Sequence, residues 1–200
     1  MLDKIKDINL ALYNKSYLSA LALSLTLPDI CGQIEYPDFK HDNGNRNIGK
    51  QYAAWFDDWV SHNYADYTGF SEDGKVNNPF FTGKMCYDLR CSFLHAGNSD
   101  IKNWGDKEDA NFHYSYEFEL AVGGADKNGS SWGNQTNNNS KILKTKTVRV
   151  NIDKLCECIS RSAEKYYREK DPNLFKDHNI NLIDFKLHYK ANDGHSIIKD

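Results

Sequence analysis

The chain has 200 residues, of which 40% are hydrophobic and 13% aromatic, so it can build one sizeable core but is short for two independent domains. Its formal net charge of -3 argues against a broad electrostatic platform for duplex nucleic acid and leaves room for a small local site. No stretch approaches the roughly 18 apolar residues of a membrane span, and acids and bases precede the first apolar run, unlike in a secretion signal. We therefore expect one domain over residues 1–200, located in the cytoplasm and without a membrane contact.

Apolar periodicity predicts three helices before residue 61. A short helix covers residues 2–12, and a second begins after Ser16 as its N-cap and stops at about Pro28. A polar loop over residues 35–47 follows. Residues 48–60 then repeat apolar side chains at the spacing of a helix that packs one stripe against a core.

In the second half of the chain, the spacing of apolar residues changes from that of a helix to that of a strand. After a loop over residues 63–81, a helix begins with Thr82 as N-cap and ends at Gly97. Residues 112–122 alternate strictly between apolar and polar, which predicts a half-buried strand, and a second strand follows at residues 142–152. A last long helix from about residue 155 stops before Asp171, and residues 179–189 fit a strand or a helix equally well.

The two predicted strands are joined by residues 123–140, which are rich in Gly, Asn and Ser. This composition predicts an antiparallel hairpin with a mobile tip. We expect basic side chains of the second strand to pair across the hairpin with acidic ones of the first, rather than to form a ridge that contacts RNA; the residues are Lys144, Lys146, Arg149, Glu117 and Glu119. The expected fold is mostly α, a helical bundle with an antiparallel β-hairpin inserted at about residues 112–152.

Neither the cysteines nor the histidines show the spacing of metal ligands. The five cysteines are scattered and odd in number, without the paired spacing of a zinc ribbon, and we interpret them as reduced thiols. The same lack of ligand spacing applies to His113, His178, His188 and His195. The sequence therefore predicts no metal and no cofactor.

Arg90 and His95 interrupt the otherwise apolar helix of residues 82–96. At ~100° per residue, a step of five residues places their side chains ~140° apart around the axis and about 7.5 Å apart along it. The two side chains converge if the helix unwinds near Gly97, or if a second copy of the chain brings its own pair to the same groove across a two-fold axis. The second option predicts a homodimer.

These two residue types fit the cleavage of RNA without a metal ion. One group must take the proton from the 2′-hydroxyl, another must protonate the leaving 5′-oxygen, and a cation must hold the charge on phosphorus. Histidine is suited to proton transfer near neutral pH, and the planar fork of arginine matches phosphate oxygens. DNA lacks the 2′-hydroxyl and would resist this reaction.

The segment YDLRCSFLHAG at residues 87–97 resembles the signature of the HEPN superfamily, an arginine followed four to six residues later by a histidine near a helix end. The resemblance implies a HEPN-like helical bundle over the whole chain, with Arg90 and His95 as catalytic residues. It also implies a metal-independent endoribonuclease that acts on RNA as a homodimer. Many members are toxins or antiphage-defence effectors, so an antitoxin or a regulatory protein is implied as a further partner.

Three other residues are candidates for auxiliary roles. Ser92 and Tyr87 are close to the pair in sequence. We expect them either to contact the substrate or, as the alternative, to pack in the core. Asp29, which follows the predicted helix stop, pairs with Arg90 from a neighbouring helix or caps a turn. Cys91 with His95 would form a Cys/His enzyme, but neither a separate base nor an orienting acid is identifiable for it.

Three other interpretations remain open. Arg90 could pair with a core carboxylate while His95 caps its own helix, which needs no function at all. A catalytically inactive HEPN-like module that binds RNA or protein is suggested by the acidic net charge and by Cys91, where active members often carry a polar residue. A structural or regulatory protein would use an edge of the hairpin as its interface.

Overall fold

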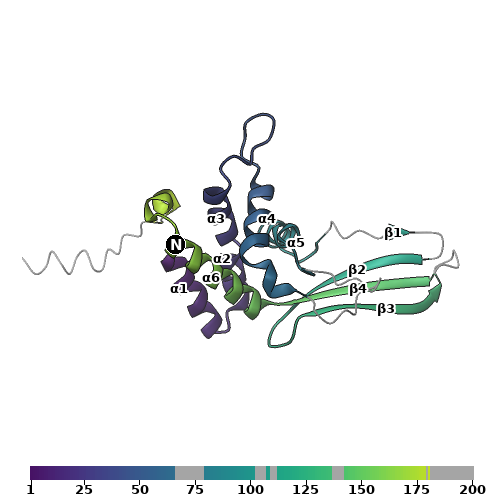
Figure 1. Ribbon diagram of the computed structural model, residues 1–200. Coiled ribbons are helices and arrows are strands. Elements are labelled where there is room, and N and C mark those ends of the chain that lie inside the picture. Colours follow the sequence, from purple (N-terminus) through teal and green to yellow (C-terminus); the bar gives the residue numbers. More distant parts are fainter. Residues whose placement is uncertain (66–78, 102–106, 109–111, 137–141, 179, 181–200) are drawn as a thin grey trace, which may run out of the picture.

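The computed structural model describes residues 1–65, 79–101, 107–108, 112–136, 142–178 and 180. A group of packed helices forms one end of the molecule, and a sheet extends away from it (Figure 1). The last strand continues directly into the last helix. The tail at residues 179–189, for which the sequence favoured no structure, lies outside the described residues except for Ile180.

Six α-helices and three shorter helical turns are found in the described part of the chain. The α-helices are α1 (Leu2–Tyr13), α2 (Tyr17–Ser24), α3 (Leu27–Glu35), α4 (Ile48–Trp59), α5 (Gly83–Cys91) and α6 (Ile152–Glu169). The turns are η1 (Ser61–Tyr64), η2 (Ser92–Ala96) and η3 (Pro172–His178). The predicted helices at residues 2–12 and 48–60, and the long helix that stops before Asp171, are confirmed.

The predicted helix from Ser16 to Pro28 is wrong in its extent. Ser16 is the N-cap of α2, but this helix ends at Ser24, and Pro28 lies in the first turn of α3. Proline has no N–H to donate, and the first turn of a helix is where no such bond is made, so Pro28 fits a helix start as well as a helix stop. As a result Asp29 stands near the N-terminus of α3.

The sheet has four strands in the order β1-β2-β4-β3. They are β1 (Lys107–Glu108), β2 (Phe112–Ala121), β3 (Lys127–Thr136) and β4 (Ile142–Asn151). β2 pairs with β4 in parallel, from Phe112 opposite Ile142 to Ala121 opposite Asn151. β1 is antiparallel to β2, and β3 is antiparallel to β4.

The expected mostly α fold with an antiparallel hairpin at residues 112–152 is therefore wrong, and the class is mixed α/β. The stretch predicted as a mobile tip contains β3, which reverses the chain so that β4 runs in the same direction as β2 and lies between β2 and β3. Alternation of apolar and polar residues carries no information about which strands pair. The expected charge pairing is present between Arg149 and Glu119, where Arg149 Nε donates to Glu119 Oε2 at 2.7 Å across the parallel strands.

One hydrophobic core joins the helices to the near end of the sheet. Its largest fully buried side chains are aromatic and include Trp55, Tyr52, Tyr64 and Tyr166. Trp55 meets Tyr166 of α6 edge to face, with ring centroids 5.9 Å apart. Val148 and Val150 of β4 are fully buried in the same core, so the start of α6 is fixed to the helices. None of the described helices is long and apolar enough to cross a membrane.

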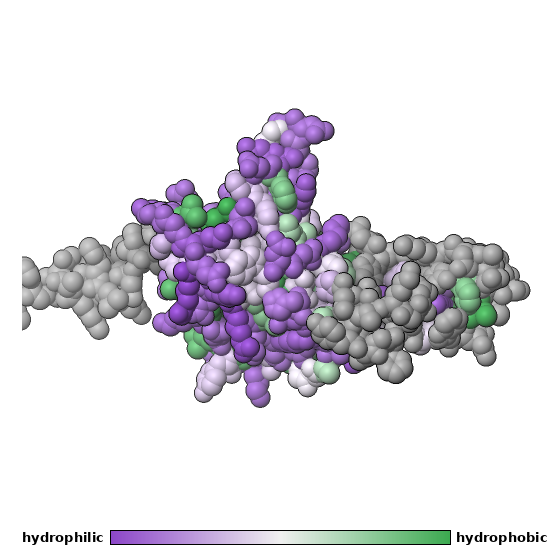
Figure 2. Space-filling view, in the orientation of Figure 1, coloured by the Kyte–Doolittle hydropathy of each residue, from purple (hydrophilic) through white to green (hydrophobic). Residues whose placement is uncertain are grey.

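The loop at residues 36–47, between α3 and α4, stands out from the helices (Figure 1) and has a hydrophilic surface in the same view (Figure 2). A β-bridge between Lys40 and Arg46 closes it, and Gly44 takes a positive φ of 81° at its turn. The end of the loop thereby lies near the first turn of α3, where Arg46 contacts Asp29.

Helices α4 and α5 pack without space for a side chain at Gly83. A Cβ atom at this position would lie 2.1 Å from the carbonyl oxygen of Ala53. Gly83→Ala should therefore lower the free energy of unfolding by about 1–3 kcal/mol, as overpacking does, measured by urea denaturation.

The matched control is Gly124→Ala, because no atom lies within 4 Å of a Cβ added there. Its free energy of unfolding should stay within about 0.5 kcal/mol of the wild-type value. Without a steric clash, alanine in place of glycine would stabilise a helix by roughly 0.5–1 kcal/mol, because alanine loses less backbone entropy on folding. A Gly83→Ala protein that is more stable than the wild type would therefore contradict the close packing.

Candidate active site

Helix α5 presents one face to the core and leaves its last turn at the surface. Thr82 caps the helix, its hydroxyl accepting from the Met85 N–H at 3.3 Å as the sequence predicted. Met85, Cys86 and Leu89 are buried against the neighbouring helices. Arg90 follows directly, at the border between the core and solvent.

The helix does not continue regularly after α5. Ser92–Ala96 form a π-helical turn, η2, which ends at Gly97 with a left-handed φ of 68°. Backbone hydrogen bonds in such a turn join residues five apart, so residues at this spacing lie one above the other on the same side. The turn therefore offers the change in helix geometry that Arg90 and His95 need to converge within one chain.

Arg90 and His95 are in direct contact. Arg90 Nη1 lies 2.9 Å from His95 Nε2, and because arginine has no acceptor, the guanidinium donates to the ring nitrogen. An imidazole that accepts at Nε2 is neutral and carries its proton on Nδ1. Of the two routes to convergence predicted from the sequence, the structure shows the one that needs no second chain.

Asp29 holds the other side of the Arg90 guanidinium. Its Oδ2 lies 3.4 Å from Arg90 Nη2, so of the two alternatives that the sequence left open for Asp29, the structure shows the contact with Arg90. Its Oδ1 pairs with Nη2 of Arg46, which also donates to the Asp29 carbonyl oxygen at 2.9 Å. One carboxylate thus bridges two arginines, and the chain of contacts runs from Arg46 through Asp29 and Arg90 to His95.

Arg46 is the site residue that the sequence analysis missed. Its guanidinium is fixed by a second partner, since Nε donates to Oε1 of Gln51, which is 1% exposed. Gln51 Nε2 in turn donates to the carbonyl oxygen of Tyr36 at 2.6 Å, which ties the two ends of the loop at residues 36–47 together. The only signal in the sequence was Asn43-Gly44, a turn-forming pair that indicates where the loop folds back.

The site is buried on one side and open on the other. The side chains of Arg90 and Asp29 are 20% and 22% exposed, and Arg90 Nε is buried without a hydrogen-bond partner in the described part of the chain. His95 is exposed at the end of η2. A ligand can therefore reach His95 and the outer edge of Arg90 while the rest of the guanidinium stays in place.

Of the remaining predicted residues, Tyr87 and Cys91 contact each other beside the pair, and Ser92 does not join them. Burial, and then the neighbouring thiol of Cys91, raise the pKa of the Tyr87 hydroxyl. Its ring packs against Gly49 and Tyr52, with the two tyrosine centroids 5.4 Å apart. The Ser92 hydroxyl donates to the carbonyl oxygen of Asp100. Tyr87 therefore serves packing, and Ser92 fixes the chain after η2.

The arrangement offers a cation and an adjacent base to a ligand at the surface. Two guanidiniums against one carboxylate leave one net positive charge, which suits a phosphodiester. No group of three or more His, Cys, Asp or Glu side chains in the described residues is placed to hold a metal ion. The cation and the base in contact at this site are Arg90 and His95.

Comparisons with models of protein families, with curated proteins and with solved structures found no match for this chain. We therefore infer a function from the geometry and chemistry of the site alone.

Removing the shared carboxylate should destabilise the fold. Asp29→Ala leaves two partly buried guanidiniums facing each other, so the free energy of unfolding should fall by about 1–3 kcal/mol in urea denaturation. Glu157→Ala is the control, because it breaks the exposed pair between Glu157 and Arg161. That variant should change stability by less than about 1 kcal/mol. An equal effect of both changes would mean that Asp29 does not hold the arginines together.

Proposed function

We propose that this protein is an endoribonuclease that cleaves RNA by attack of the 2′-hydroxyl on the adjacent phosphate, with Arg90 and His95 as its catalytic residues. The observation that carries the proposal is the 2.9 Å contact between Arg90 Nη1 and His95 Nε2 at an exposed helix end. A cation and a neutral imidazole in contact are the two groups that the first step of this reaction requires.

His95 acts as the base in this scheme. When a phosphodiester takes the donors of Arg90, Nε2 of His95 loses its partner and becomes free to accept the proton of the 2′-hydroxyl. The 2′-oxygen then forms a bond to phosphorus, and the bond between phosphorus and the 5′-oxygen breaks. The products are a 2′,3′-cyclic phosphate and a 5′-hydroxyl, without oxidation or reduction.

Arg90 stabilises the charge that develops on the phosphate oxygens. Its contact with Asp29 fixes the guanidinium plane before the substrate arrives, and such preorganisation is where most electrostatic catalysis originates. Arg46 is a positioning residue in this scheme, because it holds Asp29 from the other side. Its positive charge also offsets the repulsion between the Asp29 carboxylate and the phosphate.

The leaving 5′-oxygen needs a proton that the neutral His95 does not supply. A second copy of the chain would bring a second Arg/His pair to the same groove, and the histidine of that pair would donate the proton to the leaving oxygen. A homodimer is therefore part of the proposal. The resemblance of residues 87–97 to the HEPN signature supports the same reading, and with it a role as a toxin or antiphage-defence effector held in check by an antitoxin.

The test is cleavage of a mixed RNA pool in EDTA, followed by analysis of the product ends. The wild-type protein should leave 2′,3′-cyclic phosphates. His95→Ala and Arg90→Ala should each lower the rate by about 10²–10⁴-fold, because each removes a group that acts in the transition state.

The matched controls are His41→Ala and Arg168→Ala, which replace an exposed histidine and an exposed arginine elsewhere on the surface. Both should cleave within about twofold of the wild-type rate, as surface changes away from a site do. Cleavage that persists in His95→Ala and Arg90→Ala would overturn the proposal. Saturable RNA binding without cleavage by any variant would instead favour the inactive binding module.

A further inference from the structure

A cavity lies at the C-terminal end of α4. It has a volume of about 310 Å³ and is formed where the end of α4 and the turn η1 meet α6. This volume lies at the lower end of the ~300–1,000 Å³ range of small-molecule sites. It is lined by Asp58, Trp59, His62 and Asn63 on one side and by Cys158, Arg161, Ser162 and Lys165 on the other.

The walls of this cavity combine an aromatic ring with cations. The indole of Trp59 is partly exposed, and Lys165 Nζ lies 5.7 Å from its ring centroid. The backbone carbonyl of Trp59 accepts from the Ser162 hydroxyl at 2.8 Å, which fixes α6 against the end of α4. A flat ring beside a cation is the arrangement that binds a stacked base and its phosphate in single-stranded nucleic acid.

The two cations of the cavity are held loosely. Arg161 pairs with Glu157 at 3.1 Å and Lys165 with Glu169 at 3.9 Å, both four residues away on α6 and both largely exposed. Such exposed pairs contribute little stability, so a phosphate can displace the carboxylates at small cost. Beside them, His62 and Asn63 contact each other, with Asn63 Nδ2 3.2 Å from His62 Nε2, and Asn63 Nδ2 also donates to the Val60 carbonyl oxygen at 2.8 Å.

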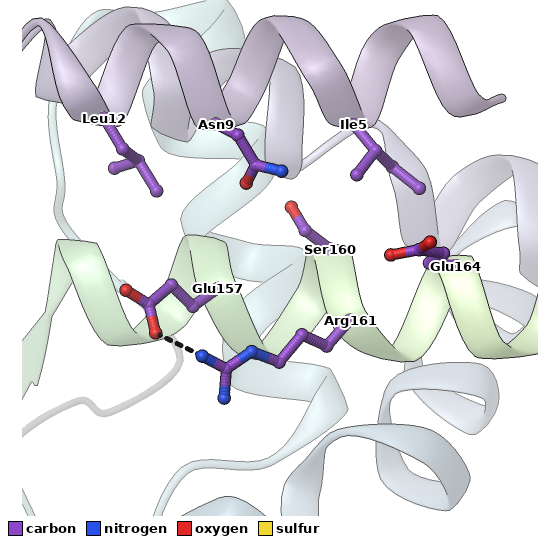
Figure 3. Close-up of a pocket in the computed structure, with 7 residues that line it drawn as sticks. All are labelled: Ile5, Asn9, Leu12, Glu157, Ser160, Arg161 and Glu164. Carbon is purple, nitrogen blue, oxygen red and sulfur yellow. Dashed lines mark hydrogen bonds and ion pairs between the residues drawn. The ribbon is translucent and has the colours of Figure 1, made fainter.

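Another hollow of the described surface has a different chemistry. A groove of about 390 Å³ between α1 and α6 is lined by Ile5 and Leu12, with Asn9 and Ser160 facing each other across it (Figure 3). Glu157 and Glu164 face it from α6 with Arg161 as its cation. No aromatic ring lines this groove, so it offers no surface on which a base can stack.

We propose that the cavity at Trp59 binds one nucleotide of a single-stranded RNA whose scissile bond lies at Arg90 and His95. The inference rests on the proposed ribonuclease function and assigns it an RNA-binding subsite. Gln51, which holds Arg46, and Trp59 are eight residues apart on α4, or about 12 Å along the helix axis. We expect a strand longer than a dinucleotide to bridge the two places.

The experiment compares Lys165→Glu with Arg168→Glu, each made in the His95→Ala protein so that the RNA stays intact. Both residues lie on α6, are about equally exposed at 69% and 73%, and pair with a glutamate four residues away. Arg168 does not line the cavity. The two variants have the same net charge, so a difference in their affinity for RNA is due to the cavity.

Affinity for a labelled RNA of about 12 nucleotides, within the range of single-strand site sizes, is measured by fluorescence anisotropy at several salt concentrations. Lys165→Glu should weaken binding at least about fivefold and reduce the slope of log affinity against log salt by about one. Arg168→Glu should stay within about twofold. Trp59→Leu, which keeps apolar bulk, should weaken binding by a similar factor with little change of the salt slope, because stacking carries no charge.

Equal affinities of the Lys165→Glu and Arg168→Glu proteins would overturn the subsite. The binding assay decides this whether or not the wild-type protein cleaves, so failure of the subsite and failure of the ribonuclease proposal are distinguished. With His95 intact, Lys165→Glu should slow cleavage of the longer RNA at low concentration and leave dinucleotide cleavage unchanged. Equal slowing on both substrates would also contradict the subsite.

Discussion

The candidate site depends on one carboxylate that is shared by two arginines. Asp29 stands in the first turn of α3, and it meets Arg46 from the following loop and Arg90 from α5. Three segments that are distant in the chain are therefore held at one point. If the carboxylate were absent, like charges would separate the loop from α5, and the contact between Arg90 and His95 would lose the anchor on its buried side.

Much of the helical part could be predicted from local pattern, whereas the sheet could not. The apolar stripe of α4 and the capping role of Thr82 depend only on residues that are near in the sequence, and both predictions are confirmed. The pairing of β2 with β4 is not local: it depends on β3, whose Gly- and Asn-rich sequence resembles a loop and which forms a strand beside β4. Pro28 was misassigned for a related reason, since proline marks either end of a helix.

The site was only partly predictable as well. The residue types and spacing indicated Arg90 and His95, and Asp29 was a candidate partner. The π-helical turn η2 that allows the pair to converge has no simple sequence signal, because its backbone pattern is selected by the packing around it. Arg46 could not be found at all, since a loop residue has no periodicity and its position is set by the turn at Gly44 and by Gln51.

In the proposed reaction, the pair at the end of α5 directs a 2′-hydroxyl onto the adjacent phosphate. The decisive substrate is an RNA in which a mapped cleavage position carries a single 2′-deoxynucleotide. Cleavage at that bond should disappear while the other bonds of the same strand are cut at their usual rates, because only the nucleophile is missing. Unchanged cleavage at the deoxy position would contradict it and would require a nucleophile other than the RNA itself.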